Sequence, residues 1–411
     1  MTGVLVIAGL TGAVLAFNSE LERVFAPRLF ATSRPDVPAL DLATLAIRAE
    51  ALVFPQGHVT GVLRTERDQV EVYVAANDGP EPGRRFDLGY TQLFVDPWTG
   101  VELGRRRRGD LSEGLINLMP FIYAVHWTLA CGVVGQWLFG LVAIAWSLDC
   151  FVGFSLTLPI SREAFWRRWL VAWRIKGGAS VYRLNVDLHR ASGLWLWPLL
   201  FVFAWSSVMM NIRPFYEAVT RTVFDYESPR TAVAALGRQA NEHPRLGWRA
   251  ALDRGQQLMA AAAARDGFAA GQPLGLQYRA ELGAYAYEVR GSRDLFERAP
   301  KGGSTVVTFD GDTGRLLRLS QPTGGRAGNT VESWLYALHM ARVFGRPYQV
   351  FVCALGFVVS MLSVTGVYLW WKKRGFRQVI AARQAQRRDH LRPSVTDAIS
   401  QPPLIGHPHE S

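Results

Sequence analysis

The sequence has few cysteines, and their positions exclude several classes of protein. Cys131, Cys150 and Cys353 are the three cysteines among 411 residues, and each lies in an apolar run. No Cys-x-x-Cys or Cys-x-x-Cys-His motif occurs. A disulfide-stapled domain, a zinc ribbon and a covalently attached c-type haem therefore all lack their usual sequence signature.

Charge is missing from long stretches of the chain. No charged residue occurs from Gln349 to Trp371, a stretch long enough to cross the roughly 30 Å core of a bilayer as a helix. Lys372, Lys373 and Arg374 end this run. Hydrophobic residues make up 49% of the chain, yet its mean hydropathy is only +0.07, so apolar spans alternate with ordinary polar sequence. We therefore expect a membrane protein that has the lipid bilayer as a partner.

The net charge of +11 has a particular distribution. The basic residues gather beside the apolar spans rather than over one groove-like face, which is typical of membrane topology, and we expect no nucleic-acid partner. The loop 159–188 and the tail 372–411 are both strongly basic, so the positive-inside rule places both in the cytoplasm. This predicts four spans with both termini in the cytoplasm and two polar segments on the outer side.

The chain divides into polar and apolar segments in a regular order. We predict a first transmembrane helix that is truncated at its start (1–17), an outer α+β unit (18–115), a second transmembrane helix with its approach segment (116–158), the basic cytoplasmic loop (159–188), a third transmembrane helix (189–211), a second outer α+β unit (212–330), an approach segment with the fourth transmembrane helix (331–371) and the basic tail (372–411).

The second half of the chain repeats the first. A shift of 213 positions aligns the second and fourth spans without a gap, and it matches Tyr123 with Tyr336, Ala124 with Ala337, His126 with His339, Gly132 with Gly345, Gln136 with Gln349, Ser147 with Ser360 and Gly153 with Gly366. Both halves enter the membrane from the same side. The predicted fold is therefore a four-helix membrane bundle built from a duplicated half, whose copies are related by an axis along the membrane normal.

The duplicated histidine is the most informative feature of the repeat. An axis along the normal places His126 and His339 at equal depth near the outer surface, facing one another. Two facing imidazoles in a helix bundle supply both axial ligands of a haem iron. The alternative is a pair of capping or interfacial histidines. Because the histidine is duplicated at a membrane face, where ionisable groups are usually functional, we favour the haem site.

A third histidine, His189, begins the predicted third span at its cytoplasmic end. The alignment of Ala204–Ser207 with Gly9–Gly12 places the counterpart of His189 about six residues before Met1. Either the true start lies upstream or a second haem lacks one ligand. Nearby arginines, Arg183, Arg190 and Arg342, are candidates for binding haem propionates or, equally, for anchoring the spans at the interface. Asp149 lies inside the second span, and we expect it to face the bundle or a wet cavity, or to lie near the cytoplasmic end.

Several motifs together resemble the PepSY-associated transmembrane family, over nearly all of residues 1–375. They are GLTGAVLAF, FVDPWTG, TFDGDTG, DLHRASGLWLWP, LYALHMARVFGRP and LSVTGVYLWWKKR. The resemblance implies a bacterial inner-membrane protein with four helices, two periplasmic PepSY-type units and b-type haems held by paired histidines. It assigns His126 and His339 to the outer pair and His189 to the inner pair. The usual His-Arg-Trp opening of the first span is absent here.

These observations lead to three hypotheses of function. The first is a ferric-chelate reductase, in which electrons from a cytoplasmic or quinol donor pass through one haem b, or two, to a periplasmic ferric siderophore or other iron chelate. The second is a non-redox membrane anchor whose outer units bind a peptide or protein. The third, a transporter, is less favoured because the predicted spans are unbroken, whereas transporter sites are formed by broken helices.

Overall fold

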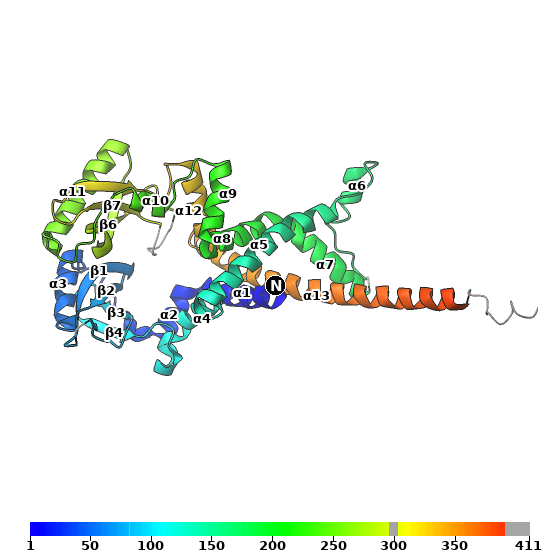
Figure 1. The fold of residues 1–411 in the computed structure, drawn as a ribbon, viewed down its shortest axis with the longest axis horizontal. Coiled ribbons are helices and arrows are strands. Elements are labelled where there is room, and N and C mark those ends of the chain that lie inside the picture. Colours follow the sequence, from blue (N-terminus) through cyan, green and yellow to red (C-terminus); the bar gives the residue numbers. More distant parts are fainter. Residues whose placement is uncertain (82, 179, 296–302, 391–411) are drawn as a thin grey trace, which may run out of the picture.

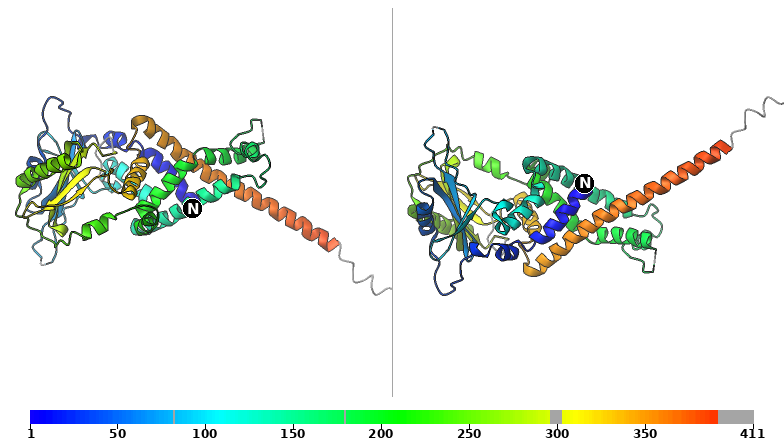
Figure 2. Two further views of the ribbon diagram at one scale, coloured as in Figure 1. Left: turned by 90° about the horizontal axis from the view of Figure 1, so that it is seen from above. Right: turned by 90° about the horizontal axis from the view of Figure 1, so that it is seen from below.

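The computed structural model describes residues 1–81, 83–178, 180–295 and 303–390. The last part of the predicted basic tail, residues 391–411, lies outside the described residues. Figure 1 shows a β-sheet with two covering helices at one end of the molecule and a bundle of apolar helices beside it. A single long helix projects away from the sheet, and Figure 2 shows the same arrangement from two further sides.

One antiparallel sheet contains the strands of both polar segments. The strand order is β4-β3-β2-β1-β5-β6-β7-β8. The first half contributes β1 (Gly57–Glu66), β2 (Gln69–Ala76), β3 (Gln92–Val95) and β4 (Glu102–Arg106), and the second half contributes β5 (Ala270–Arg279), β6 (Ala284–Gly291), β7 (Thr305–Asp310) and β8 (Leu316–Ser320). The halves join where Val62 pairs with Leu276, flanked by two further pairs. The two expected α+β units therefore share one sheet. Their first strands, β1 and β5, pair with each other, so neither of these two strands has an exposed edge.

The two faces of this sheet differ in chemistry. Helices α3 (Leu42–Val53) and α11 (Trp248–Asp266) cover one face, and their apolar residues form a core with Val62, Leu276 and Phe309. Asp41 caps α3 by accepting a hydrogen bond of 2.9 Å from the backbone N–H of Thr44. Because side chains alternate along a strand, the other face presents a second set, which is polar and faces the membrane helices.

The remaining helices lie mostly in the bundle or at its ends. They are α1 (Thr2–Leu15), α2 (Asn18–Phe25), α4 (Leu118–Thr128), α5 (Gly132–Thr157), α6 (Phe165–Trp169), α7 (Val181–Trp195), α8 (Trp197–Asn211), α9 (Arg213–Val223), α10 (Pro229–Ala234), α12 (Ala327–His339) and α13 (Gly345–His390), with short 3-10 turns at Pro27–Leu29, Leu111–Glu113, Leu115–Asn117 and Ala280–Leu282. Among the described residues, α5 and the 345–384 part of α13 are long and apolar enough to cross a membrane. The number of candidate spans rises to four if each of two bent helix pairs counts as one.

The two bent pairs compare differently with the sequence predictions. The first apolar segment ends by residue 17, and the charged helix α2 follows it after a bend of 73°. The third span was expected to run unbroken from residue 189 to residue 211, and this is wrong: α7 starts at Val181 and meets α8 at a bend of 71°. Pro198, in the first turn of α8, has no N–H to continue the α7 ladder. Unbroken spans therefore no longer argue against a transporter.

The fourth span also differs from expectation at its end. The apolar run stops at Trp371 as predicted, but α13 continues to His390. Ala, Arg, Gln and Lys, which dominate this extension, are strong helix formers and need no apolar partner to stay helical. The lysines end the apolar part of the helix, not the helix itself.

Helix packing follows the internal repeat. A shift of 195 positions places α1 on α8 and α2 on α9, and the shift of 213 places α5 on α13. Helix α1 packs against α13, and the equivalent helix α8 packs against α5, so each long helix contacts the other half of the chain. At the first crossing, a Cβ atom on Gly356 would overlap the backbone oxygen of Gly9. This crossing therefore requires glycine, as is common where membrane helices approach closely.

Candidate functional site

Two short helices carry the duplicated histidines. His126 lies near the end of α4 and His339 is the last residue of α12. Each short helix is followed by a break with residues in the left-handed region, and a glycine then begins the long helix: Gly132 at φ 57° and Gly345 at φ 63°. Because only glycine adopts this conformation without strain, the breaks are fixed at equivalent positions in both halves. The histidines therefore sit at equivalent places in the fold.

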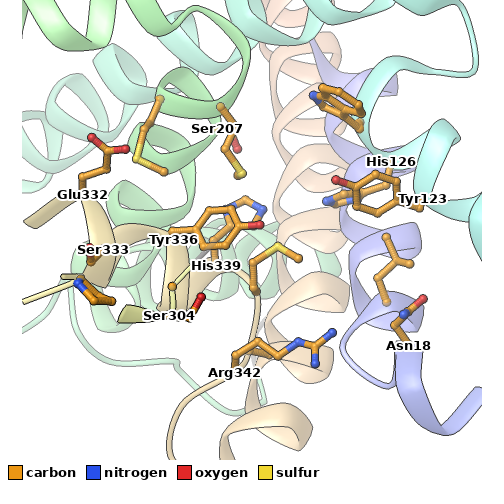
Figure 3. Close-up of a pocket in the computed structure, with 18 of the residues that line it drawn as sticks. Asn18, Tyr123, His126, Ser207, Ser304, Glu332, Ser333, Tyr336, His339 and Arg342 are labelled. Atoms are coloured by element: carbon orange, nitrogen blue, oxygen red, sulfur yellow. The ribbon is translucent and has the colours of Figure 1, made fainter. Parts of the chain in front are cut away.

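The structure brings the two predicted ligands together. The ring centroids of His126 and His339 are 6.2 Å apart, with an angle of 60° between the ring planes. Figure 3 shows the two rings pointing toward one another across a cavity that both of them line. These residues are 213 positions apart in the sequence, so the packing of the two halves alone sets their separation.

Each of these imidazoles is held by a hydroxyl group. Nδ1 of His126 lies 3.0 Å from Oγ1 of Thr11, and Nδ1 of His339 lies 2.7 Å from Oγ of Ser206. The Thr11 hydroxyl donates its hydrogen to the carbonyl oxygen of Ile7, and the Ser206 hydroxyl donates to that of Phe203. Both hydroxyl oxygens therefore accept from Nδ1–H, and this tautomer leaves the lone pair of Nε2 available for a metal.

The separation of the rings fits a metal held between them. An imidazole nitrogen binds a metal at about 2.0–2.1 Å. In a five-membered ring with bonds of about 1.35 Å, each nitrogen lies about 1.15 Å from the centroid. Two imidazoles on opposite sides of one metal therefore have centroids about 6.3–6.5 Å apart. The 6.2 Å between His126 and His339 is close to this range.

The neighbouring residues leave room for these rings and add no further ligands. A Cβ atom at position 12 would lie 3.0 Å from Cε1 of His126, so Gly12 lets the imidazole rest against α1. Within the described parts of the chain, no three or more His, Cys, Asp and Glu side chains converge on a common point. A pair of axial imidazoles suits a metal whose other positions are filled by a macrocycle, whereas structural zinc sites have four protein ligands. The residues present therefore fit a haem.

A cavity of about 1150 Å³ extends from the histidines to the polar face of the sheet. It exceeds the volume of most small-molecule and cofactor sites, about 300–1,000 Å³. Tyr123 and Tyr336 line it beside the histidines, as Figure 3 shows, and residues from all eight strands of the sheet form the opposite wall. A ligand and a cofactor can therefore share this space.

Comparison with known protein families agrees with this architecture. A family model described as the PepSY-associated TM region matches residues 1–373. The chain belongs to this family. It is accordingly a membrane protein, with two to four apolar spans beside an antiparallel sheet. A search of curated proteins gives no match.

In this PepSY-associated protein, His189 lies on α7, away from the pair. Its Nδ1 is 3.0 Å from Oγ1 of Thr365, whose hydroxyl donates to the carbonyl oxygen of Met361. The arrangement at His189 is thus the same as at the pair. Thr365, the partner of His189, lies nine residues after the cavity residue Gly356 on α13. At 1.5 Å per residue, His189 is therefore about 14 Å further along the helix than that part of the cavity. Within the described part of the chain, no ring contact joins His189 to a second histidine.

The structure gives the other predicted residues different environments. Arg183 and Arg190 both form ion pairs with the buried carboxylate of Asp187, at 3.1 and 2.8 Å, so they stabilise the start of α7. Arg342 lines the cavity three residues after His339. Asp149 is exposed on α5, eight residues before this helix ends at Thr157, so it does not pack into the apolar core; the alternatives of a wet cavity or a place near the cytoplasmic end stay predictions.

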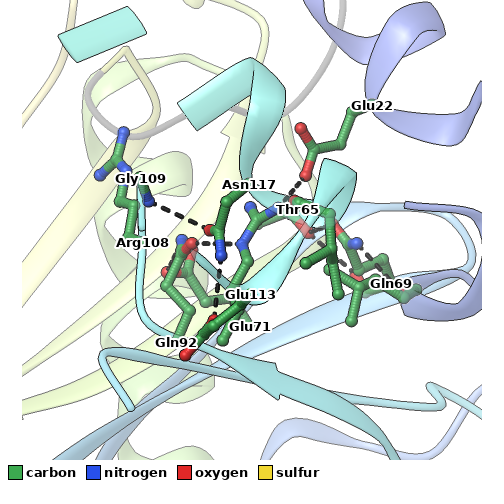
Figure 4. Close-up of polar contacts among 12 residues, drawn as sticks. Glu22, Thr65, Gln69, Glu71, Gln92, Arg108, Gly109, Glu113 and Asn117 are labelled. Carbon is green, nitrogen blue, oxygen red and sulfur yellow. Dashed lines mark hydrogen bonds and ion pairs between the residues drawn. The ribbon is translucent and has the colours of Figure 1, made fainter. Parts of the chain in front are cut away.

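Sequence reasoning missed a polar network between the sheet and the helices, drawn in Figure 4. Arg106, at the end of β4, is 6% exposed. Its guanidinium donates to Gln92 at 2.8 Å, to the carbonyl oxygen of Ile116 at 2.7 Å and to Glu22 on α2. Gln92 in turn donates to Glu71 at 3.0 Å. Because Ile116 lies two residues before the start of α4, this network fixes the helix that carries the first histidine against the sheet.

Proposed function

We propose that this protein is a haem-containing oxidoreductase of the bacterial inner membrane that passes electrons to a ferric chelate on the outer side. The observation that carries the proposal is the pair of facing imidazoles, His126 and His339, at a separation that suits two axial ligands of one iron. Haem bound there supplies reversible one-electron chemistry. No side chain is needed as an acid or a nucleophile.

The side chains around the pair have defined roles in this proposal. Thr11 and Ser206 fix the tautomer and orientation of the two imidazoles, which would leave each Nε2 available to hold a haem iron. The cavity between the pair and the sheet admits the chelate to the same space. Reduction of ferric iron weakens its hold on hard oxygen ligands, so the reaction releases iron from a siderophore or a similar chelate.

The proposed topology places both termini in the cytoplasm and the sheet in the periplasm. The four spans are α5, the apolar part of α13 and the two bent pairs, arranged as one bundle from the duplicated halves. The basic segment 159–188 and the basic extension of α13 lie at the end of the molecule opposite the sheet, in agreement with the positive-inside rule (Figure 1). His189 is the candidate ligand of a second haem, on the path from a cytoplasmic or quinol donor.

Absorption spectra of the purified full chain from haem-replete cells test the proposal. We expect a Soret band, and we expect His126→Ala and His339→Ala each to remove most of it, because one imidazole alone cannot fill both axial positions. His58→Ala is the matched control, since this exposed histidine lies on β1 and bonds Asn77 at 2.7 Å. The absence of a Soret band in the unsubstituted protein, or an unchanged band in both variants, contradicts the proposal.

The alternative is a membrane-anchored binding or regulatory protein without redox chemistry. The continuous eight-stranded sheet, whose polar face lines a large cavity, is the observation that favours it. A strain that carries the double His126→Ala/His339→Ala variant separates the two functions. Normal iron-dependent growth of that strain supports the binding function, whereas a growth defect supports reduction.

A further inference from the structure

The cavity between the histidines and the sheet has an uneven charge. Among the described residues, five glutamates and seven arginines line it, and no aspartate or lysine does. The paired glutamates are Glu22 with Arg106, Glu332 with Arg213 at 2.5 Å, Glu227 with Arg318 at 3.0 Å and Glu66 with Arg23 at 3.8 Å, and Glu71 accepts a hydrogen bond from Gln92. Four of these five glutamates are therefore ion-paired with arginines within the protein.

Two of the lining arginines lack such a partner. Among the described residues, Arg108 and Arg279 have no carboxylate within 4.0 Å of their guanidinium nitrogens. The guanidinium of Arg108 lies 5.2 Å from the centre of the Tyr123 ring. Tyr123 lies on α4, one helical turn before His126. Arg279 lies at the end of β5, on the opposite wall of the cavity. The two positive charges thus belong to different walls of one space.

Arg279 also acts on a buried carboxyl group of the neighbouring strand, Glu288 of β6. Burial raises the pKa of this carboxyl, while the Ser304 hydroxyl and the charge of Arg279 lower it. In the described part of the chain, seven arginines line the cavity against five glutamates, so the space in front of the histidines is electropositive.

We propose that this cavity selects anionic iron chelates, in which the net negative charge is carried by carboxylate or similar oxygens, and that Arg108 and Arg279 bind those oxygens. The inference rests on the proposed function and specifies its substrate. Guanidinium groups form charge-assisted, often bidentate hydrogen bonds with carboxylates, and a walled cavity focuses the field of fixed charges. Such a site binds a cationic chelate less well, because the like charges repel.

Binding of redox-silent gallium(III) complexes to the full chain in lipid nanodiscs tests this separately from reduction. Gallium(III) citrate is the anionic probe, and the gallium(III) complex of a trihydroxamate with a free amine is the cationic one. We expect the anionic complex to bind at least about tenfold more tightly and to weaken with added salt. Arg108→Gln and Arg279→Gln should each weaken it by about three- to tenfold without improving binding of the cationic complex. Arg265→Gln is the control, since this exposed arginine pairs with Asp266 on α11, outside the cavity.

The outcomes are distinguishable. Equal affinity for both probes, or unchanged citrate binding in the double Arg108→Gln/Arg279→Gln variant, overturns the inference. If that variant instead loses haem while gallium citrate binding persists, the arginines serve the carboxylates of the cofactor and the inference is equally overturned. A protein that binds gallium citrate through these arginines but shows no Soret band supports the anion site and contradicts the haem function.

Discussion

The two halves of the chain place a histidine at the same point but secure its helix in different ways. In the first half, Glu22 on α2 meets Arg106, which comes from strand β4. The equivalent glutamate of the second half, Glu217 on α9, pairs at 3.0 Å with Arg213, four residues earlier on the same helix. Arg213 also reaches Glu332, which lies seven residues before His339 on α12. The glutamate is repeated, while the arginine comes from another element.

This difference indicates what each histidine is coupled to. Arg106 ties the start of α4 to the sheet, so the position of His126 depends on the sheet domain. Arg213 ties α12 directly to α9. By contrast, α12 reaches the sheet indirectly, from Asn329 to Glu227 and from there to Arg318 of β8. The position of His339 therefore depends more on contacts within the helical layer. A change in the sheet, such as the arrival of a ligand in the cavity, therefore acts more directly on the first histidine than on the second.

Removing the two arginines is the strongest way to test this comparison. Arg106→Met should lower the free energy of unfolding by roughly 3–5 kcal/mol, because it leaves the largely buried Glu22 carboxylate and the carbonyl of buried Ile116 without their donor. Arg213→Met should cost about 1–3 kcal/mol, since the Arg213 side chain is 26% exposed and water can replace it. Thermal unfolding in detergent measures both. Equal losses would remove the distinction between the halves.

The helix crossings offer a second, smaller test. Gly9 and Gly356 form the crossing of α1 with α13, whereas Ala204 and Ala143 occupy the equivalent places where α8 meets α5. Gly356→Ala should destabilise the protein by roughly 1–3 kcal/mol, because its methyl group overlaps the backbone of α1. Ala143→Gly should cost only about 1 kcal/mol, from lost packing and helix propensity. If both changes have the same effect, the crossings are equally close and the symmetry extends further than we infer.

The internal repeat made the histidine pair predictable. A gapless shift of 213 positions aligned His126 with His339, and the long apolar runs predicted the long helices. The strand pairing of β1 with β5 was not predictable, because nothing local specifies which edge meets which across more than 200 residues. The bend at Pro198 had a visible signal in the sequence, which the apolar run around it obscured.

The polar contacts were harder to foresee. Arg106 lies in a run of four arginines, Arg105–Arg108, and its partner Glu22 is 84 positions away, so only the packed structure identifies which of them is buried and with what partner. The hydroxyls of Thr11 and Ser206 were aligned by the shift of 195 positions without being given a role. A lone hydroxyl in an apolar helix usually donates to a backbone carbonyl of its own preceding turn, and Thr11 and Ser206 both do so. The sequence therefore does not reveal that each hydroxyl oxygen also contacts a histidine of another helix.

Those two hydroxyls provide the finest test of the comparison, because here the halves differ by one methyl group. Thr11→Val and Ser206→Ala should each weaken haem binding by about tenfold, or roughly 1.4 kcal/mol, since an imidazole without its acceptor loses its fixed tautomer. Titration of the apoprotein with haem measures this. The exchange Thr11→Ser/Ser206→Thr keeps both acceptors and should leave the affinity within about twofold. If the exchange is as harmful as the deletions, it is the shape of these side chains, and not their oxygen atoms, that holds the imidazoles in place.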